Sequence, residues 1–369
     1  MTKISDLPRD VTEEVLSRLP MTSMRAARFT CTKWNTLSKY ENFTEKHLSE
    51  AKKTHKEEFQ VIMMLEHRVC LFSVNLLDPS IECIGKLMSL NVDDRVDIFR
   101  IFHCDGLLLC ITNDISRRLV VWNPYSGQTR CIGFEPTNSL YGFYRYALGY
   151  EEKNKSCLSN KILRFMDNYE DDRAEDLIRE FEIYDLDSDS WKVVDLTPEC
   201  EVEFNHHGLS LKGNTYWFAE EKIALGPGRG MSDMTGFLIC FDFTRERFGP
   251  RMPLPFHSSN GDYVTLSSVR DEQLAVLFQS YGVSTVKIWI SSKIEPNAVL
   301  WRKLFLAVDM KLLPDFEFYI DPESFLVDEK KKVVMVLDKD KNKYYSTRNV
   351  ANIIGKEGYF RIVDLGEST

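Results

Sequence analysis

The chain has 369 residues, of which 43% are hydrophobic, and its formal net charge is −9. Such a length accommodates two or three average domains, or one small and one large domain. An acidic chain exerts no long-range attraction on a polyanion, so we expect no nucleic-acid partner. No apolar run approaches the ~20 residues that a membrane helix needs, and no charged-then-apolar leader opens the sequence. We therefore expect no membrane association and no secretion.

The nine cysteines are odd in number, and no two of them have Cys-x-x-Cys spacing. Most lie inside apolar runs, where a thiol behaves as a small hydrophobe. Without a secretion signal, this pattern predicts reduced thiols in a reducing compartment. We expect an intracellular protein of the nucleus, the cytoplasm or both.

The first forty residues predict three short helices. Asp10 followed by Glu13 is a variant of the capping box that opens many helices. Val11, Val15 and Leu19 recur every four residues, so they lie along one helix face. Pro20 ends this first helix because proline lacks a donor N–H and clashes with the preceding turn. Three helices of this size cannot bury all their apolar side chains among themselves.

This stretch resembles an F-box, and about ten positions agree in order without a gap. The agreement rests on Leu7-Pro8, Asp10-Val11, Val15-Leu16, Leu19-Pro20, Met24, Cys31 and Trp34. The resemblance implies that the helices dock on a Skp-type adaptor, which ties them to a cullin scaffold. The expected adaptor-binding residues are Leu7, Pro8, Val11, Val15, Leu16, Leu19, Pro20 and Met24. We expect Trp34 and Cys31 to hold the helices together instead. The alternative is an ordinary helical cap packed on the core of its own chain.

From Phe59 onward the sequence is dominated by strand signals. Six hairpin signatures, each with two apolar runs around turn residues, lie at 70–84, 119–132, 181–194, 238–248, 286–304 and 351–363. Several are preceded by a further hairpin-like run. Four strands that repeat every 50–60 residues or so are typical of propeller blades. The sequence therefore predicts an all-β propeller of six blades.

The blades resemble kelch-type blades at Trp122-Asn-Pro-Tyr-Ser-Gly127, although the chain contains no Gly-Gly pair. The combination of both parts resembles plant F-box proteins with an F-box-associated interaction domain. Further agreement lies at 145–150, 208–214 and 241–243. The resemblance implies an α+β multidomain chain. We expect a three-helix F-box at residues 1–48, a linker at 49–58 and a kelch-like propeller at 59–369 that holds the substrate.

Two stretches are candidates for covalent chemistry or phosphate binding. Ser210 lies between Gly208 and Gly213, but the second glycine is one place too late for a nucleophile elbow. The glycine-rich stretch 226–230 is not followed by Lys-Ser or Lys-Thr, so it is not a phosphate loop. We interpret both as turns or loops between strands, and we predict no catalytic residue.

Three stretches are candidates for metal sites. His206 and His207 are adjacent, and neighbours on a strand point to opposite faces. The acidic run 167–176 lacks the spacing of a calcium loop. Asp185, Asp187 and Asp189 are typical turn residues. We predict no metal and no cofactor.

The sequence as a whole favours the substrate-recognition subunit of a Skp–cullin–F-box ubiquitin ligase, which bridges the adaptor and a target protein without making or breaking bonds itself. One alternative is a non-ligase module that binds the adaptor only. Another is a propeller enzyme with a convergent pocket. The target protein is unknown, and the loops at 140–143, 167–176, 225–236 and 256–262 are candidate contacts.

Overall fold

The structure is a computed structural model. It describes residues 8–19, 21–38, 40–54, 59–65, 68–76, 80–86, 97–113, 118–133, 144–154, 157–166, 181–196, 202–204, 208–221, 236–258, 261–302, 304–310, 324–339 and 348–367.

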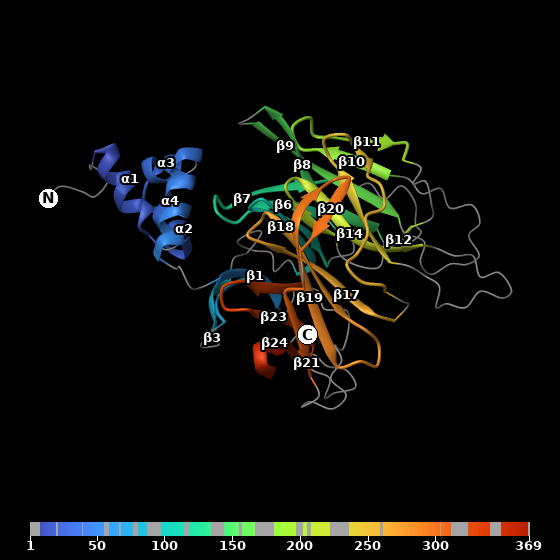
Figure 1. Ribbon diagram of the computed structural model, residues 1–369. Coiled ribbons are helices and arrows are strands. Elements are labelled where there is room, and N and C mark those ends of the chain that lie inside the picture. The colour runs from blue at the N-terminus through green and yellow to red at the C-terminus, as the bar shows by residue number, and fades with distance from the viewer. Residues whose placement is uncertain are drawn as a thin grey trace. The chain divides into compact units, whose positions relative to one another are not determined.

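The described N-terminal residues form α1 (Arg9–Ser17), α2 (Met21–Thr30), α3 (Thr32–Leu37) and α4 (Glu41–Thr54) (Figure 1). The three predicted helices are present, and α4 is a fourth helix beyond them. Helix α4 continues to Thr54, so the first half of the stretch predicted as a linker, 49–58, is helical. Residues 55–58 lie outside the described residues.

The predicted capping box at Asp10 is also wrong. Helix α1 begins at Arg9, directly after Pro8, and no side chain caps it. The carbonyl of Pro8 accepts hydrogen bonds from the backbone N–H of Thr12 at 3.0 Å and from its hydroxyl at 2.9 Å. Proline suits this place because its fixed φ prepares the chain for a helix and its missing N–H is not needed there.

The helices share one small core. It consists of Leu16, Met24, Ala27, Trp34, Leu37 and Phe43, with Leu19 and Cys31 packed against it. The prediction that Trp34 and Cys31 hold the helices together is confirmed. The side chains of Leu16 and Met24 are 0% and 1% exposed, so they belong to the same core.

The described strands form six antiparallel sheets. The first contains β1 (Phe59–Leu65), β2 (Arg68–Asn75) and β3 (Ser80–Lys86). The second contains β4 (Ile98–Cys104), β5 (Leu107–Thr112), β6 (Leu119–Asn123) and β7 (Gln128–Ile132). The third contains β8 (Tyr144–Asn154), β9 (Cys157–Met166), β10 (Phe181–Asp185) and β11 (Ser190–Val194).

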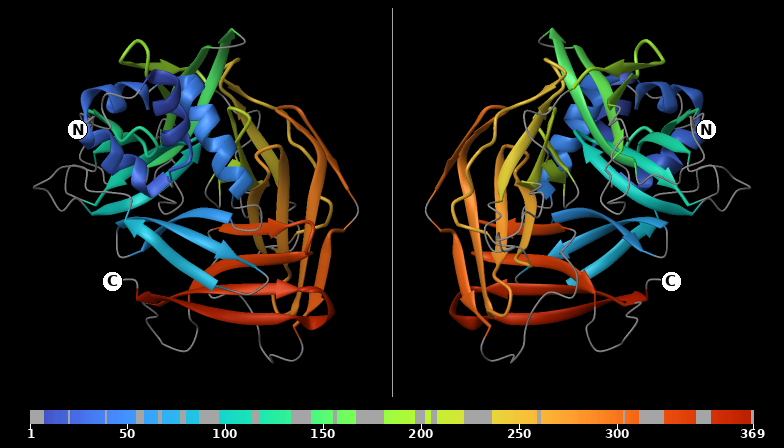
Figure 2. Two further views of the ribbon diagram at one scale, coloured as in Figure 1. Left: turned by 90° about the vertical axis from the view of Figure 1, so that its left-hand side faces the viewer. Right: turned by 90° about the vertical axis from the view of Figure 1, so that its right-hand side faces the viewer.

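The last three sheets complete the fold. The fourth contains β12 (Val202–Phe204), β13 (Leu209–Leu211), β14 (Asn214–Glu221), β15 (Phe237–Asp242) and β16 (Arg247–Phe248). The fifth contains β17 (Tyr263–Val269), β18 (Gln273–Gln279), β19 (Thr285–Glu295), β20 (Ala298–Trp301) and β21 (Leu306–Asp309). The sixth contains β22 (Ser324–Asp328), β23 (Val333–Lys339), β24 (Arg348–Gly355) and β25 (Phe360–Glu367), which lie side by side in Figure 2.

Each predicted hairpin is a pair of neighbouring strands, and the fold is a six-bladed β-propeller preceded by a helical domain. The predicted turns fall between paired residues, as in Trp122↔Thr129 of β6 and β7 and Tyr184↔Trp191 of β10 and β11. The fifth hairpin differs from the expectation, because β19 pairs with β20 along one half and with β21 along the other. Backbone contacts divide the chain into two compact units, one of residues 1–101 and 106–134, the other of 102–105 and 135–369.

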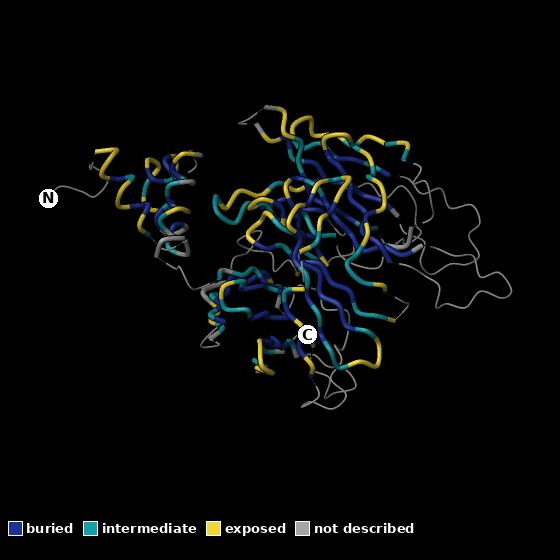
Figure 3. The backbone as a smooth tube through the Cα atoms, in the orientation of Figure 1, coloured by how far each residue is buried: buried dark blue, intermediate teal, exposed yellow. Residues whose placement is uncertain are grey.

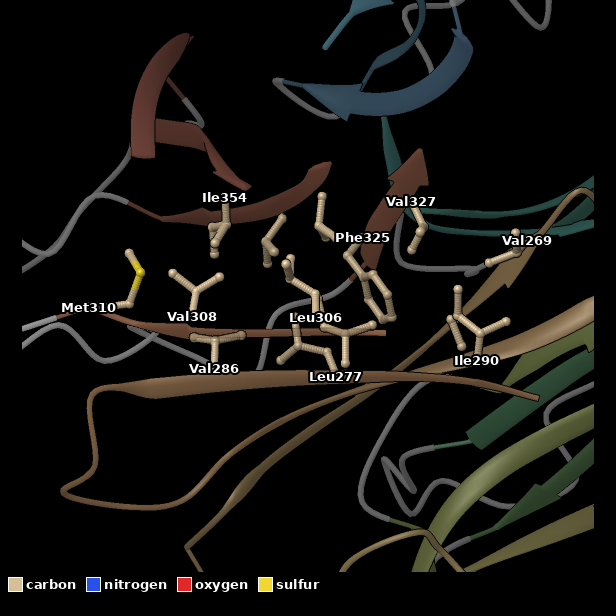
Figure 4. Packing of buried hydrophobic residues seen from close by; sticks show 14 residues of the cluster. Val269, Leu277, Val286, Ile290, Leu306, Val308, Met310, Phe325, Val327 and Ile354 are labelled. Carbon is tan, nitrogen blue, oxygen red and sulfur yellow. The ribbon is translucent and has the colours of Figure 1, made fainter. Parts of the chain in front are cut away.

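The blades of the second unit are apolar on both faces of many strands, because each is packed between neighbours. Strand β15 is buried along its whole length. Strands β17 and β22 contact each other, and between their blades lies an aliphatic cluster in which Leu277 and Ile290 pack near Phe325 and Val327 (Figure 4). This packing explains why the strands appear in the sequence as nearly continuous apolar runs.

Blades three and four are also joined by hydrogen bonds. The backbone N–H of Tyr150 donates to the carbonyl of Gly213 at 3.0 Å. A Cβ on Gly149 would lie 2.2 Å from Cδ2 of Phe243 and 2.5 Å from the Gly213 oxygen. Only glycine therefore fits at Gly149, which accounts for the Leu-Gly-Tyr sequence at this point.

Candidate adaptor-binding face

The outward side of α1 carries two valines that the helical core does not cover. Val11 and Val15 are 40% and 45% exposed, and Figure 3 shows exposed positions along this helix. Residues four apart on a helix are neighbours on its surface, so the two side chains form one apolar patch. Leu16 points the other way, into the core. We call Val11 and Val15 the valine patch.

Three exposed ion pairs lie along α1 beside this patch. Glu14 accepts from Arg18 at 2.6 Å and from Lys46 of α4 at 2.8 Å, and Arg9 pairs with Glu13 at 3.1 Å. The hydrogen bonds from Lys46 and Arg18 hold the pKa of Glu14 below its ordinary value. Because these groups are exposed, the pairs add little stability. The Lys46–Glu14 pair joins α1 to α4, whereas the other two pairs lie within α1.

A hollow lies between the start of α1 and α4. Its volume is about 320 Å³, and its lining residues are Arg9, Glu13, Tyr40, Asn42, Phe43 and Lys46. The Arg9 guanidinium lies 5.2 Å from the centre of the Tyr40 ring, and Tyr40 is 50% exposed. The hollow thus offers both charges and an aromatic surface, a combination suited to an amphipathic partner side chain.

The structure separates the predicted adaptor-binding residues into three groups. Pro8, Val11 and Val15 are exposed, and Leu19 is half-buried against the core. Leu7 and Pro20 lie outside the described residues.

Leu16 and Met24 require a correction, because both are buried and cannot meet a partner while the helices stay folded. Leu16 was expected at the adaptor, but its side chain is part of the helical core.

Sequence reasoning missed Tyr40. It stands alone between two helices, outside any periodic pattern, so periodicity could not identify it. The only available signal was an aromatic residue in a polar connection. Its exposure and its contact with Arg9 make it a further candidate for the adaptor-binding face.

The stretches weighed for catalysis do not form a catalytic site in the part that the structure describes. The hydroxyl of Ser210 donates to the carbonyl of Leu148 at 2.5 Å, so it serves the junction between blades three and four. Asp185 accepts from the backbone N–H of Asp187 at 2.8 Å and of Ser188 at 3.1 Å, as expected of a turn residue. The stretch 226–230 lies outside the described residues.

Metal ligands do not gather either. Among the described residues, no group of three His, Cys, Asp or Glu side chains is placed to hold a metal ion. His206, His207 and the run 167–176 lie outside those residues. None of the described helices is long and apolar enough to span a membrane.

Most of the candidate target-binding loops also fall outside the described residues, namely 140–143, 167–176 and 225–235. At the remaining one, the Asp262 carboxylate accepts from the Ser280 hydroxyl at 2.9 Å and from the backbone N–H of Tyr281 at 3.0 Å. These bonds order the β18–β19 turn and leave Tyr281 69% exposed. Sequence reasoning did not single out Tyr281, since one aromatic residue in a turn carries no pattern.

Comparison with known proteins accounts for both parts of the chain. Residues 4–46 match the F-box domain, and residues 60–369 match the F-box associated beta propeller domain. The chain belongs to the plant F-box proteins with an F-box associated β-propeller. An F-box/kelch-repeat protein of Arabidopsis thaliana is 71% identical to this F-box protein over 100% of this chain and 95% of its own length. A putative F-box protein of the same plant is 51% identical over 99% and 92%.

Solved structures resemble this F-box protein only distantly. A post-proline cleaving enzyme from Rickettsia typhi aligns with a TM-score of 0.37 and 9% identity, over 98% of this chain and 58% of the enzyme. A structure of a nidogen/laminin complex aligns with a TM-score of 0.39 and 9% identity, over 80% and 89%. Neither of the two matching families is a catalytic one.

Proposed function

We propose that this F-box protein is the substrate-recognition subunit of a Skp–cullin–F-box ubiquitin ligase. The observation that carries the proposal is the valine patch, an apolar surface that remains in solvent after the helices have formed their own core. Family membership supports a role in complexes of this type. An adaptor that covers Val11 and Val15 would remove the remaining apolar area from water, which favours association.

The proposed mechanism is positioning. The helical domain binds a Skp-type adaptor and, through it, a cullin, while the propeller binds a target protein. The chain itself makes and breaks no bonds. A target held close to a ubiquitin-loaded enzyme reacts at a high effective concentration. The chain therefore supports catalysis by the assembly if it binds the adaptor and the target at the same time. The ordered, exposed Tyr281 is one position where the propeller can contact the target.

We also propose that the protein works in a reducing compartment, the nucleus or the cytoplasm. Among the described residues, seven cysteines are free: Cys31, Cys70, Cys83, Cys104, Cys110, Cys131 and Cys240. Disulfides are rare in such compartments, and free buried thiols are stable there.

The test is co-purification of the full chain with a Skp-type adaptor and a cullin. The variant Val15→Asp places a charge within the valine patch. It should abolish capture of both partners, because burial of an unpaired charge at an interface costs a large free energy. The control Val193→Asp changes a valine of β11 that is 64% exposed, and it should leave capture unchanged.

Capture of the adaptor without the cullin would favour the non-ligase alternative. Equal capture by the wild type and by Val15→Asp would contradict the proposed face.

A further inference from the structure

The turn between β6 and β7 presents one aromatic side chain at a fixed place. Asn123 accepts from the backbone N–H of Ser126 at 2.9 Å with its side chain and from that of Gly127 at 2.8 Å with its carbonyl. Gly127 has φ +71°, which glycine adopts without strain. These bonds order the turn, and Tyr125 lies at its tip. The blade does not need Tyr125 for its own core, in which Trp122 is buried instead.

Tyr125 contacts the helical domain, which belongs to the same compact unit. The guanidinium of Arg28 in α2 lies 5.1 Å from the centre of the Tyr125 ring. The ring of His47 in α4 lies 5.6 Å from it, tilted by 53°. A cation over an aromatic face is attracted by its quadrupole, and the attraction is stronger when both groups are shielded from water. Burial lowers the pKa of Arg28 and raises that of Tyr125, as expected of groups that shield each other.

The helical partners of Tyr125 are themselves held in place. The Arg28 Nε donates to the Ser38 hydroxyl at 2.9 Å. His47 is fully buried, and its Nε2 donates to the carbonyl of Leu19 at 2.6 Å, since a carbonyl can only accept. Leu19 follows α1, so the contact at Tyr125 is linked through His47 to the helix that carries the valine patch.

We propose that Tyr125 is a positioning residue that holds the helical domain against the second blade through its contacts with Arg28 and His47. We call these contacts the lock. The turn motif Trp122-Asn-Pro-Tyr-Ser-Gly127 then has two parts: its other residues shape the blade, and Tyr125 serves the helices. The lock goes beyond the proposed function and does not depend on it. The lock would also fix the orientation of the propeller relative to a bound adaptor. That consequence for ubiquitination does rest on the proposed function.

The experiment uses the full chain and compares Tyr125→Ala with Tyr125→Phe. The alanine variant loses the ring, so backbone amides in α2 and α4 should exchange with deuterium about 5- to 30-fold faster. Small-angle X-ray scattering should show a larger maximum dimension as the helical domain moves away. The phenylalanine variant keeps the ring over Arg28 and should restore both readouts. The control Tyr281→Ala removes an equally large side chain from another hairpin turn and should change neither readout.

Two results would overturn the lock. One is a Tyr125→Ala protein whose helical exchange and scattering match those of Tyr281→Ala. The other is faster exchange confined to β6 and β7, which would show that Tyr125 serves the blade only.

Adaptor capture, measured in parallel, separates the lock from the proposed function. Tyr125→Ala keeps the valine patch and should capture the adaptor like the wild type. If the wild type captures none, the proposed function fails while the two readouts still decide the lock.

Discussion

The exposure of the valine patch allows its contribution to adaptor binding to be estimated. Val11 and Val15 leave 40% and 45% of their surface in water. Complete burial of a valine contributes about 1.5–3 kcal/mol, so covering what remains of both would contribute roughly 1.3–2.6 kcal/mol. Alanine removes two of the three side-chain carbons. The double variant Val11→Ala/Val15→Ala should therefore lose about 1–2 kcal/mol of binding free energy, a roughly 5- to 30-fold rise in Kd.

Titration calorimetry with a purified Skp-type adaptor measures this loss, and Val193→Ala is the matched control on the propeller. Leu16→Ala provides the contrast. Leu16 is 0% exposed, so truncation should lower the stability of the helical domain by about 2–5 kcal/mol and unfold it before binding can be read. The reasoning is refuted if the double valine variant stays helical by circular dichroism and binds the adaptor as tightly as the wild type.

Four further predictions concern the propeller. Lys161 is 4% exposed and pairs with two partly exposed carboxylates, so Lys161→Met should lower the free energy of unfolding by about 2–4 kcal/mol in urea titrations. Burial alone would raise the pKa of Glu246, but hydrogen bonds from two lysines hold it below its ordinary value. Ionised Glu246 therefore contributes its full stabilisation at neutral pH, and melting temperatures should fall as acid protonates it. Burial raises the pKa of Cys110 to about 12, so iodoacetamide at neutral pH should modify the exposed Cys131 and spare Cys110 in mass spectra. Gly149→Ala should lower the melting temperature through a clash that costs about 1–3 kcal/mol or more.

Three of these have a control in the same chain. Lys192 also pairs with Glu246 but is 53% exposed, so Lys192→Met should change stability far less than Lys161→Met. Equal losses would contradict the role of burial, and a stability independent of acid would contradict the pairing of Glu246. Rapid labelling of Cys110 would show an accessible thiol. Gly133 has nothing within 4 Å of its Cβ, so Gly133→Ala should be harmless, and an equally mild Gly149→Ala would contradict the clash.

The sequence predicts the blades well because a hairpin is a local structure. Two apolar runs and the turn residues between them lie within a dozen residues, as in the pair Tyr184↔Trp191. The division of β19 between β20 and β21 could not be predicted in this way. It depends on which backbone groups β19 meets along its length, and a continuous apolar run gives no sign of that.

The adaptor-binding face was only partly predictable. A stripe of apolar residues identifies an amphipathic helix, yet it does not say which edge of the stripe the neighbouring helices cover. Val15 and Leu16 are adjacent, and the structure exposes one and buries the other. Tyr125 escaped prediction for a different reason, because its partners Arg28 and His47 are distant in the sequence and join it only in the folded chain.

The ion pairs of the two compact units differ in their access to water, and ionic strength should therefore act on them differently. Glu14 and its partners Arg18 and Lys46 are open to solvent, whereas Lys161 is enclosed between blades three and four. Dissolved ions screen exposed charges within a distance of about 8 Å at physiological salt, but they penetrate little into a buried pair. A rise in salt should thus weaken the Lys46–Glu14 pair between α1 and α4 while the pairs of Lys161 remain intact. The part of the chain proposed to meet the adaptor would respond to its ionic surroundings, and the part proposed to hold the target would not.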